Sequence, residues 1–370
     1  MGGGPVAGEV AQASGLRAPS GGWRHPIRGA SQDRTRHRQQ PLTSRGPPHR
    51  PDTETLGNRR PPAGGGRADT GDRTRSGKQG ARTMQIGFHT DAFNSAYFSF
   101  EACLKWAQKN GVRFIECGLI DGVSWIHGLG YQPHVALYED PVLLRRKMEG
   151  YGLRFSQVDA AFPLSTKEGP SRGVPYVLKA IAWANLAGAP CVDTTDGLHA
   201  PEGLNDAEAM EMMKREYAQI VEVAEAHKIT VNIEPHGHFT TRPEMMEKML
   251  AFCDSPYLRM NMDTGNTFIA GQDPVAFLEQ FVGKVSHVHI KDVSESLAAS
   301  TRGKQTGIAV SQCAIGDGVN AGNIRACLGI LKKNGYAGTL SMECEGQGGP
   351  MIERSLAWLR KTLQELKIGD

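Results

Sequence analysis

The chain has 370 residues, 39% of them apolar, which is enough for two ordinary domains or one large barrel. Its formal charge of +3 averages two unlike parts, because residues 1–83 hold 15 Lys and Arg against 6 Asp and Glu, whereas the rest holds 27 bases against 33 acids. The chain shows no secretory apolar run near residue 1, no apolar run of about 18 residues and no Cys-x-x-Cys pair. We therefore expect a soluble, cytoplasmic protein without a membrane span or a disulfide framework.

The first 83 residues are rich in Arg, Gly and Pro and show almost no apolar periodicity. Such a segment cannot bury enough surface to offset its chain entropy, so residues 1–83 are predicted to be a disordered extension. An Arg-rich stretch can bind nucleic acid or address an organelle, but this one has 14 Arg to a single Lys and no amphipathic face. We favour an unstructured extension, with Met84 as the natural beginning of the folded domain.

From Met84 onward, short apolar runs alternate eight times with helical patterns, which is typical of a parallel sheet wrapped by helices. The helical stretches include residues 100–110, 142–151, 176–186 and 206–227. Eight such units predict an α/β fold, a (β/α)8 TIM barrel over residues 84–370. The predicted strands are Gln85–Thr90, Val112–Gly118, Arg154–Asp159, Pro190–Thr194, Thr230–Glu234, Leu258–Asp263, Ser286–Lys291 and Gly338–Glu343.

An open, doubly wound sheet is the alternative architecture. A sheet of that kind that binds a dinucleotide has a glycine-rich turn after its first strand, but here the first strand runs into a His-Thr-Asp stretch at 89–91. The Gly-Asp-Gly stretch at 316–318 follows the seventh strand and lacks the Lys-Ser/Thr ending of a phosphate-binding loop. The barrel is therefore the predicted fold.

In a TIM barrel the reacting groups stand at the carboxyl ends of the strands. The fifth to eighth predicted strands carry, at or near their carboxyl ends, Glu234, Asp263, His289 and Glu343 in that order. Crowded carboxylates in a low-dielectric pocket need a cation or protons, and a divalent metal supplies that charge. Two Glu, one Asp and one His form a mostly oxygen ligand set, which suits Mn²⁺ best and Mg²⁺ or Co²⁺ less well. The sequence thus predicts an open metal site that could bind neighbouring oxygens of a polyol.

Two of these positions are ambiguous, because residues two apart on a strand share a face. His287 and His289 should both point inward, and so should Glu343 and Glu345. We prefer His289 because it lies closer to the rim, and we prefer Glu343 over Glu345. Other strands also end in polar residues, for which a structural role is the more ordinary interpretation: His89, Asp159 and Asp193.

These motifs resemble the xylose-isomerase-like barrels, a family that includes ketose 3-epimerases, inosose dehydratase and endonuclease IV. The resemblance covers about residues 84–368 and is sharpest in the runs 232–238, 261–266, 287–292 and 341–345. It implies one Mn²⁺-like ion held by Glu234, Asp263, His289 and Glu343. In the epimerases the two Glu ligands also transfer protons on opposite faces of the sugar, a role that the resemblance carries onto Glu234 and Glu343.

One departure from the family pattern bears on function. Many relatives have a His three residues after the Asp ligand, and endonuclease IV uses that His to bind zinc, whereas this chain has Asn266. A neutral amide is a poor ligand for a second zinc, and the acidic barrel segment opposes DNA phosphate. We therefore expect no nucleic-acid partner.

The resemblance implies a divalent-metal-dependent sugar isomerase or epimerase, which removes a proton beside a carbonyl and forms a metal-stabilised enediolate. The alternative is the catalytic subunit of a C-glycoside deglycosidase, a lyase that eliminates an aglycone from a 3-oxo-C-glycoside and works with a smaller partner subunit. A non-catalytic sugar-binding barrel is a third interpretation. A homo-oligomer is compatible with each of them.

Further polar residues follow the proposed ligands. His236, two residues beyond Glu234, is the candidate for an additional acid or base, with packing at the rim as its ordinary interpretation. The identity of the sugar or glycoside depends on loops such as 121–133, where Trp125 could stack on the substrate, and 294–313. The residues expected to contact the substrate are His238, Asn266 and Lys291.

Overall fold

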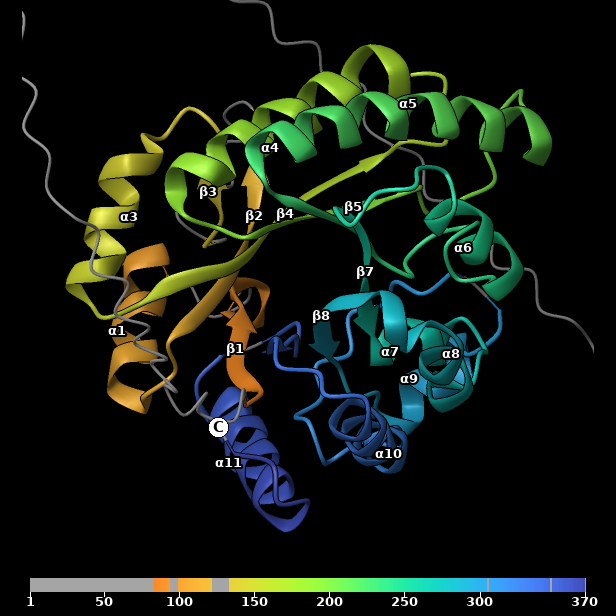
Figure 1. The fold of residues 1–370 in the computed structure, drawn as a ribbon. Coiled ribbons are helices and arrows are strands. Elements are labelled where there is room, and N and C mark those ends of the chain that lie inside the picture. The colour runs from red at the N-terminus through yellow and green to blue at the C-terminus, as the bar shows by residue number, and fades with distance from the viewer. Residues whose placement is uncertain (1–82, 94–98, 122–132, 305, 347, 370) are drawn as a thin grey trace, which may run out of the picture. The chain divides into compact units, whose positions relative to one another are not determined.

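The structure is a computed structural model that describes residues 83–93, 99–121, 133–304, 306–346 and 348–369. Residues 1–82 of the predicted extension, and Trp125 of the predicted specificity loop, lie outside the described residues. Residues 83–369, with the gaps just given, form a single α/β barrel (Figure 1).

Eight strands pair in parallel around a closed ring, which confirms the predicted (β/α)8 TIM barrel. The first strand closes the ring, because it pairs with β2 on one side and with β9 on the other, so that Gly87 is aligned with both Phe114 and Ser341. The eight strands are β1 (Gln85–His89), β2 (Phe114–Ile120), β4 (Arg154–Pro163), β5 (Cys191–Thr195), β6 (Thr230–Ile233), β7 (Leu258–Asp263), β8 (Val285–Ile290) and β9 (Thr339–Met342). The short strand β3 (Val135–Ala136) adds to β2 and is not part of the ring.

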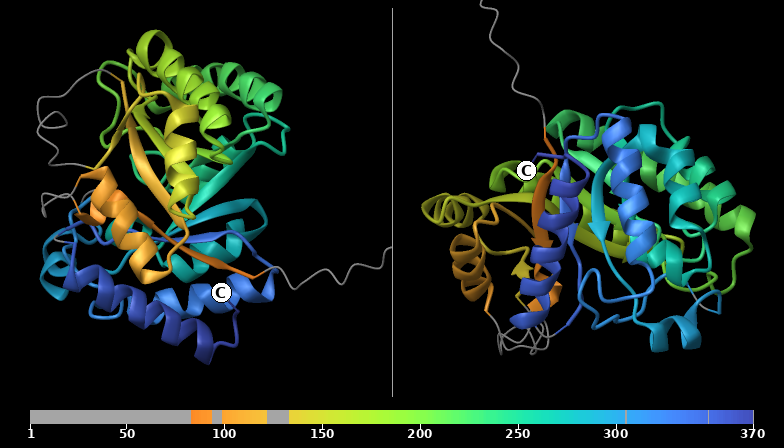
Figure 2. Two further views of the ribbon diagram at one scale, coloured as in Figure 1. Left: turned by 90° about the vertical axis from the view of Figure 1, so that its left-hand side faces the viewer. Right: turned by 90° about the horizontal axis from the view of Figure 1, so that it is seen from below.

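Helices surround the barrel (Figure 2). They are α1 (Phe100–Asn110), α3 (Pro141–Gly150), α4 (Val174–Ala187), α5 (Asp206–His227), α6 (Pro243–Leu250), α7 (Thr264–Ile269), α8 (Pro274–Phe281), α9 (Glu295–Thr301), α10 (Ala321–Lys333) and α11 (Pro350–Glu365), with short turns η1 (Thr90–Phe93), η2 (Gly169–Gly173) and η3 (Val282–Lys284). Local signals explain the bounds: the Ser99 side chain caps the start of α1, and Gly111 ends it at a φ of 66°. Among the described residues, no helix combines the length and the apolar character needed to cross a bilayer.

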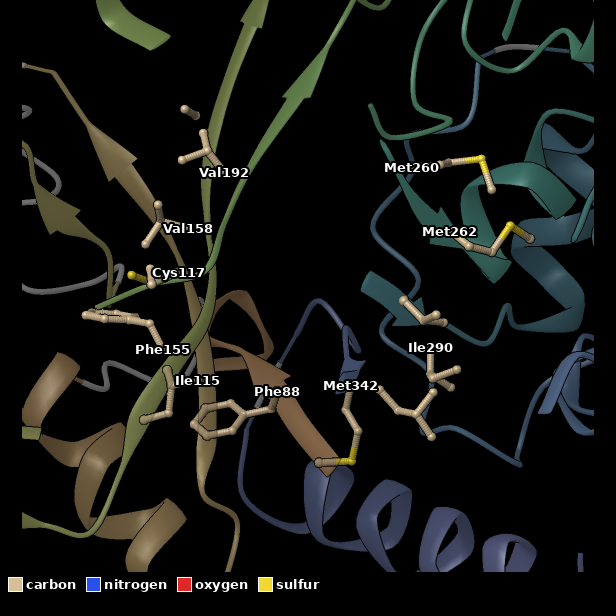
Figure 3. Packing of buried hydrophobic residues seen from close by; sticks show 14 of the residues in the cluster. Phe88, Ile115, Cys117, Phe155, Val158, Val192, Met260, Met262, Ile290 and Met342 are labelled. Atoms are coloured by element: carbon tan, nitrogen blue, oxygen red, sulfur yellow. The ribbon is translucent and has the colours of Figure 1, made fainter. Parts of the chain in front are cut away.

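The predicted strands agree with the observed ones to within two residues, except that β4 continues to Pro163. Apolar and polar side chains alternate along β7 and β8, and the apolar set belongs to the core between strands and helices, as Met260 and Met262 of β7 and Ile290 of β8 illustrate (Figure 3). The opposite face of the strands points into the barrel. That interior is lined by buried polar side chains, among them Glu116, Gln157, Asn232, Asn261 and His287.

Candidate metal-binding active site

Four neighbouring strands bring one potential metal ligand each to the same end of the barrel. Glu234 follows β6, Asp263 ends β7, His289 lies next to the last residue of β8, and Glu343 follows β9. All four side chains are buried, and one ligand atom from each lies within 4.8 Å of the others. The structure thus brings together the four residues that sequence analysis predicted as a ligand set.

Asp263 both ends β7 and begins α7. Its Oδ1 accepts hydrogen bonds from the backbone N–H groups of Gly265, at 2.6 Å, and Asn266, at 2.7 Å, which caps the helix. A glycine is needed in this turn, because a Cβ at position 265 would lie 2.4 Å from Cγ of Lys291. The second oxygen, Oδ2, has no hydrogen-bond partner in the described part of the chain. Asp263 therefore gives one oxygen to the backbone and leaves the other for the cluster.

The imidazole ring of His289 lies at the centre of the cluster. Its Nδ1 is 3.0 Å from Oε1 of Glu234, 3.1 Å from Oε2 of Glu343 and 3.8 Å from Oδ2 of Asp263. Its other nitrogen, Nε2, lies 2.9 Å from Oε2 of Glu116, deeper in the barrel. One edge of the ring thus faces the three carboxylates, and the opposite edge faces a fourth.

The three carboxylates leave this cluster short of positive charge. Burial and the neighbouring Glu343 carboxylate raise the pKa of Asp263 well above its usual range. Oδ2 of Asp263 is buried without a hydrogen-bond partner among the residues described, and Oε2 of Glu343 faces Nδ1 of His289, a single nitrogen that also faces Glu234. A divalent cation between the four side chains would supply both the missing charge and the missing partners, and the oxygen-rich donor set fits Mn²⁺, Mg²⁺ or Co²⁺.

Strand alternation could not distinguish His287 from His289, or Glu343 from Glu345, but the structure gives the two members of each pair different surroundings. His289 lies in the cluster, whereas Nε2 of His287 lies 3.7 Å from Oε2 of Glu116. Burial lowers the pKa of His287 to about 4, so its ring is neutral. Glu345 lies beyond the end of β9 with a φ of 40°, and its Oε1 lies 2.7 Å from Nζ of Lys291. Strand alternation no longer applies there, which is why Glu343 and Glu345 have different surroundings.

Lys291 is fully buried beside the cluster. Besides its contact with Glu345, its Nζ donates a hydrogen bond to Oδ1 of Asn266 at 3.1 Å. Asn266 in turn donates through Nδ2 to Oε1 of Glu234 at 3.2 Å. Two of the residues that we expected to contact the substrate, Lys291 and Asn266, are therefore linked to the ligand set by hydrogen bonds.

His236 and His238 lie on the loop after β6 and have different surroundings. Nδ1 of His236 lies 3.9 Å from Oε2 of Glu234 and has no hydrogen-bond partner within the described ranges. Nε2 of His238 lies 3.2 Å from Oδ1 of Asp206, at the start of α5, and its ring packs against Phe239. The structure thus brings His236 to the cluster, but it places His238 against α5.

Two buried contacts between a carboxylate and a histidine were missed from the sequence. In the first, Glu116 contacts His289. The feature of the sequence that could have indicated this contact is a lone charged residue inside the apolar run 114–120. The second contact joins Oδ1 of Asp91 and Nδ1 of His89, which lie 3.0 Å apart. Burial alone would lower the pKa of His89, but the Asp91 carboxylate and other nearby acids raise it to about 10. The signal here was an aspartate two residues after the histidine that ends β1.

Fold and site together define a class of protein: a TIM barrel with an oxygen-rich group of potential metal ligands at the carboxyl ends of its strands. The sequence model of the xylose isomerase-like TIM barrel family matches residues 104–362. The chain belongs to that family, as its motifs indicated.

Known proteins similar to this chain share its fold more clearly than its sequence. The inosose dehydratase of Clostridium botulinum (strain Eklund 17B / Type B) is 26% identical over 140 residues, which are 36% of this chain and 46% of that protein. The chain therefore spans less than half the length of this curated relative. A solved D-tagatose 3-epimerase-like protein has a TM-score of 0.61 at 19% identity, covering 77% of this chain and 98% of its own. The IOLI protein, solved with a bound zinc atom, has a TM-score of 0.56 at 14% identity, covering 77% and 95%.

Proposed function

We propose that this chain is a divalent-metal-dependent sugar isomerase or epimerase. The observation that carries the proposal is the convergence of Glu234, Asp263, His289 and Glu343, which are buried with ligand atoms within 4.8 Å of one another. TIM barrels build active sites from the carboxyl ends of several strands in this way. The relatives named for inosose dehydration and for tagatose epimerisation support a small polyhydroxylated substrate.

In this proposal Glu234 and Glu343 are the proton-transfer pair. One carboxylate removes the proton from the carbon beside the substrate carbonyl, and the other returns a proton, to the same carbon in an epimerisation or to its neighbour in an isomerisation. When bound between the four side chains, a divalent ion, with Mn²⁺ preferred over Mg²⁺ or Co²⁺, would supply positive charge for the substrate carbonyl and for the enediolate that forms from it. Asp263 and His289 complete the set that holds it.

Neighbouring polar side chains support Glu234. Asn266 orients Glu234 through its hydrogen bond at 3.2 Å, and Lys291 orients Asn266 in turn. His236, with Nδ1 unpartnered and 3.9 Å from Glu234, is placed to exchange a proton with a sugar hydroxyl. We assign His238 a structural role, in which its contact with Asp206 holds the loop after β6 against α5, and not a role in substrate binding.

The test is proton exchange at the substrate carbon. Glu234→Gln and Glu343→Gln should each lower turnover by about 10²- to 10⁴-fold, because each removes one proton-transfer group. Purified protein loaded with Mn²⁺ would be screened against ketoses in D₂O, and deuterium in recovered sugar would be measured by mass spectrometry. Glu216→Gln is the matched control, because it makes the same substitution at a buried glutamate on α5, outside the proposed site, and it should keep wild-type turnover. Full activity in either site variant would refute the proposal.

Elimination is the second reaction that this site could catalyse, and the match to an inosose dehydratase favours it. The first proton removal is the same, but the enediolate then breaks the bond to a leaving group on the next carbon, and His236 is the acid that protonates that group as it departs. A protein that leaves ketoses unchanged but releases an aglycone from a 3-oxo-C-glucoside, alone or with a smaller added subunit, would be a C-glycoside lyase. The two product analyses decide between the reactions.

A further inference from the structure

We infer that Glu116 is a positioning residue for His289: its carboxylate accepts the Nε2 proton and thereby directs Nδ1 of the same ring at the metal ion. The inference rests on the proposed function, because it concerns the ion that the four side chains would hold. It assigns a role to a strand, β2, that contributes none of the four proposed ligands.

Glu116 is a carboxylate in the middle of an otherwise apolar strand. Its side chain points into the barrel and is completely buried. A buried carboxylate is costly unless hydrogen bonds satisfy it. Both of its oxygens have partners: Oε1 accepts from Nε2 of Gln157 at 2.8 Å, and Oε2 lies 2.9 Å from Nε2 of His289.

A chain of hydrogen bonds fixes the orientation of Glu116. The Gln157 amide cannot be reversed freely, because its Oε1 accepts from Nδ2 of Asn232 at 2.5 Å. The chain of hydrogen bonds continues to Ser286, whose hydroxyl donates to Oδ1 of Asn232 at 2.5 Å. All three amide and carboxylate groups are buried in the barrel interior. The network therefore presents Oε2 of Glu116 to the His289 ring in a single arrangement.

The two edges of the His289 ring then have different tasks. Among the carboxylates of the described ranges, only Glu116 lies at hydrogen-bond distance from Nε2, whereas Nδ1 faces Glu234 and Glu343 at 3.0 and 3.1 Å. The Asn261 amide lies 3.2 Å from both ring nitrogens and does not distinguish them. If Nε2 carries the proton that Glu116 accepts, Nδ1 presents its lone pair to the cluster. A carboxylate in this position fixes the tautomer of a ligating histidine and makes it more basic, and its loss costs such sites about 10- to 100-fold in metal affinity.

A different role for Glu116 is also geometrically available. Glu116, His287 and His289 have ligand atoms close enough to hold an ion of their own. In that case the chain would bind two ions, and removing Glu116 would remove one of them. Comparing the number of ions bound by the wild type and by a Glu116 variant therefore separates a positioning role from a second metal site at Glu116.

The experiment uses the full chain stripped of metal with EDTA and titrated with Mn²⁺, with the free ion followed by electron paramagnetic resonance. Glu116→Leu removes the acceptor, and Glu116→Gln keeps an oxygen but loses the charge. We expect one Mn²⁺ per chain in all proteins, at least 10-fold weaker binding for the Leu variant and an intermediate loss for the Gln variant. Glu216→Gln, the buried control, should bind within twofold of wild type.

A second measurement, on the zinc-loaded wild type, reads the ring directly and does not depend on how the Glu116 variants fold. Long-range ¹H–¹⁵N spectra, assigned with His289→Gln, should show the proton on Nε2 and the metal on Nδ1. A proton on Nδ1, a folded Leu variant that binds within threefold of wild type, or a second Mn²⁺ in the wild-type chain that Glu116→Leu loses would overturn the inference. A wild-type chain that binds neither Mn²⁺ nor Zn²⁺ would instead overturn the proposed function on which it rests.

Discussion

Lys291 and Glu345 form a buried ion pair directly beside the potential ligands. The ammonium group lies 2.7 Å from Oε1 of Glu345, and Oε2 of Glu345 accepts from the backbone N–H of Ser311 at 3.1 Å. Bulk water can solvate the remaining charge only poorly if one partner is removed, because Lys291 is fully buried and the Glu345 side chain is 15% exposed. Burial raises the pKa of Glu345, although the Lys291 ammonium opposes that shift. The pair is therefore sensitive to the loss of one partner.

Lys291→Met is predicted to lower the free energy of unfolding by about 3 kcal/mol, because it leaves the Glu345 carboxylate buried and unpaired. The double variant Lys291→Met/Glu345→Gln should recover part of that loss. Guanidinium unfolding of the metal-free wild type, both single variants and the double variant at pH 7 measures the loss of unfolding free energy in each. Single-variant losses that simply add in the double variant would show that the two side chains are not coupled.

At the scale of elements, α7 depends on the same aspartate that faces the cluster. Asp263 has two separable tasks, since Oδ1 caps the helix and Oδ2 is left for an ion. Asp263→Asn keeps a capping oxygen but loses the charge, whereas Asp263→Ala loses both. We predict that the Ala variant is about 1 kcal/mol less stable than the Asn variant when metal-free, and that both bind Mn²⁺ poorly. Chemical unfolding and Mn²⁺ titration test this, and equal stabilities would contradict the capping role.

Helix α5 carries a buried acid without a partner. Glu216 is 1% exposed, and neither of its carboxylate oxygens has a hydrogen-bond partner in the ranges that the structure describes. Gly169 of η2 lies against it, since a Cβ there would be 2.6 Å from Oε1. Burial raises the pKa of Glu216 from 4.5 to about 8. The folded chain therefore holds a proton at neutral pH that the unfolded chain has released.

Because the folded pKa is the higher one, stability is predicted to fall as the pH rises from about 4.5 through 8. Glu216→Gln keeps the shape without the charge, so it should match the wild type near pH 5 and exceed its unfolding temperature at pH 9. Thermal unfolding at the two pH values measures the effect, with Glu222→Gln on the exposed side of α5 as the control. A difference between variant and wild type that does not change with pH would rule out this account.

At the scale of the whole molecule, the barrel was predictable because each strand and helix shows its own periodicity. Eight apolar runs separated by capped helices indicated the ring, and β7 was predicted with its observed bounds. Closure of β1 onto β9 could be expected only from the count of strands, since the paired residues, such as Gln85 and Thr339, lie far apart in the sequence. The division between residues 1–83 and the barrel stays a prediction, because 1–82 lie outside the described residues.

The site was predictable where it follows the strand ends and not where it depends on three-dimensional contacts. Glu234 and Asp263 could be placed at the rim from strand bounds alone. The choice between Glu343 and Glu345 needed the backbone, because the φ of 40° at Glu345 breaks the alternation of β9. Glu116 could not be connected with His289, because 173 residues separate them and only the closed barrel brings β2 and β8 together.

The central claim is that one divalent ion binds where four adjacent strands end. The most direct measurement is anomalous diffraction at the manganese absorption edge from crystals of the wild-type chain grown with Mn²⁺. We predict one peak per chain, within about 2.0 to 2.4 Å of atoms from Glu234, Asp263, His289 and Glu343. A peak at another place in the barrel, or no peak at saturating Mn²⁺, would contradict the account.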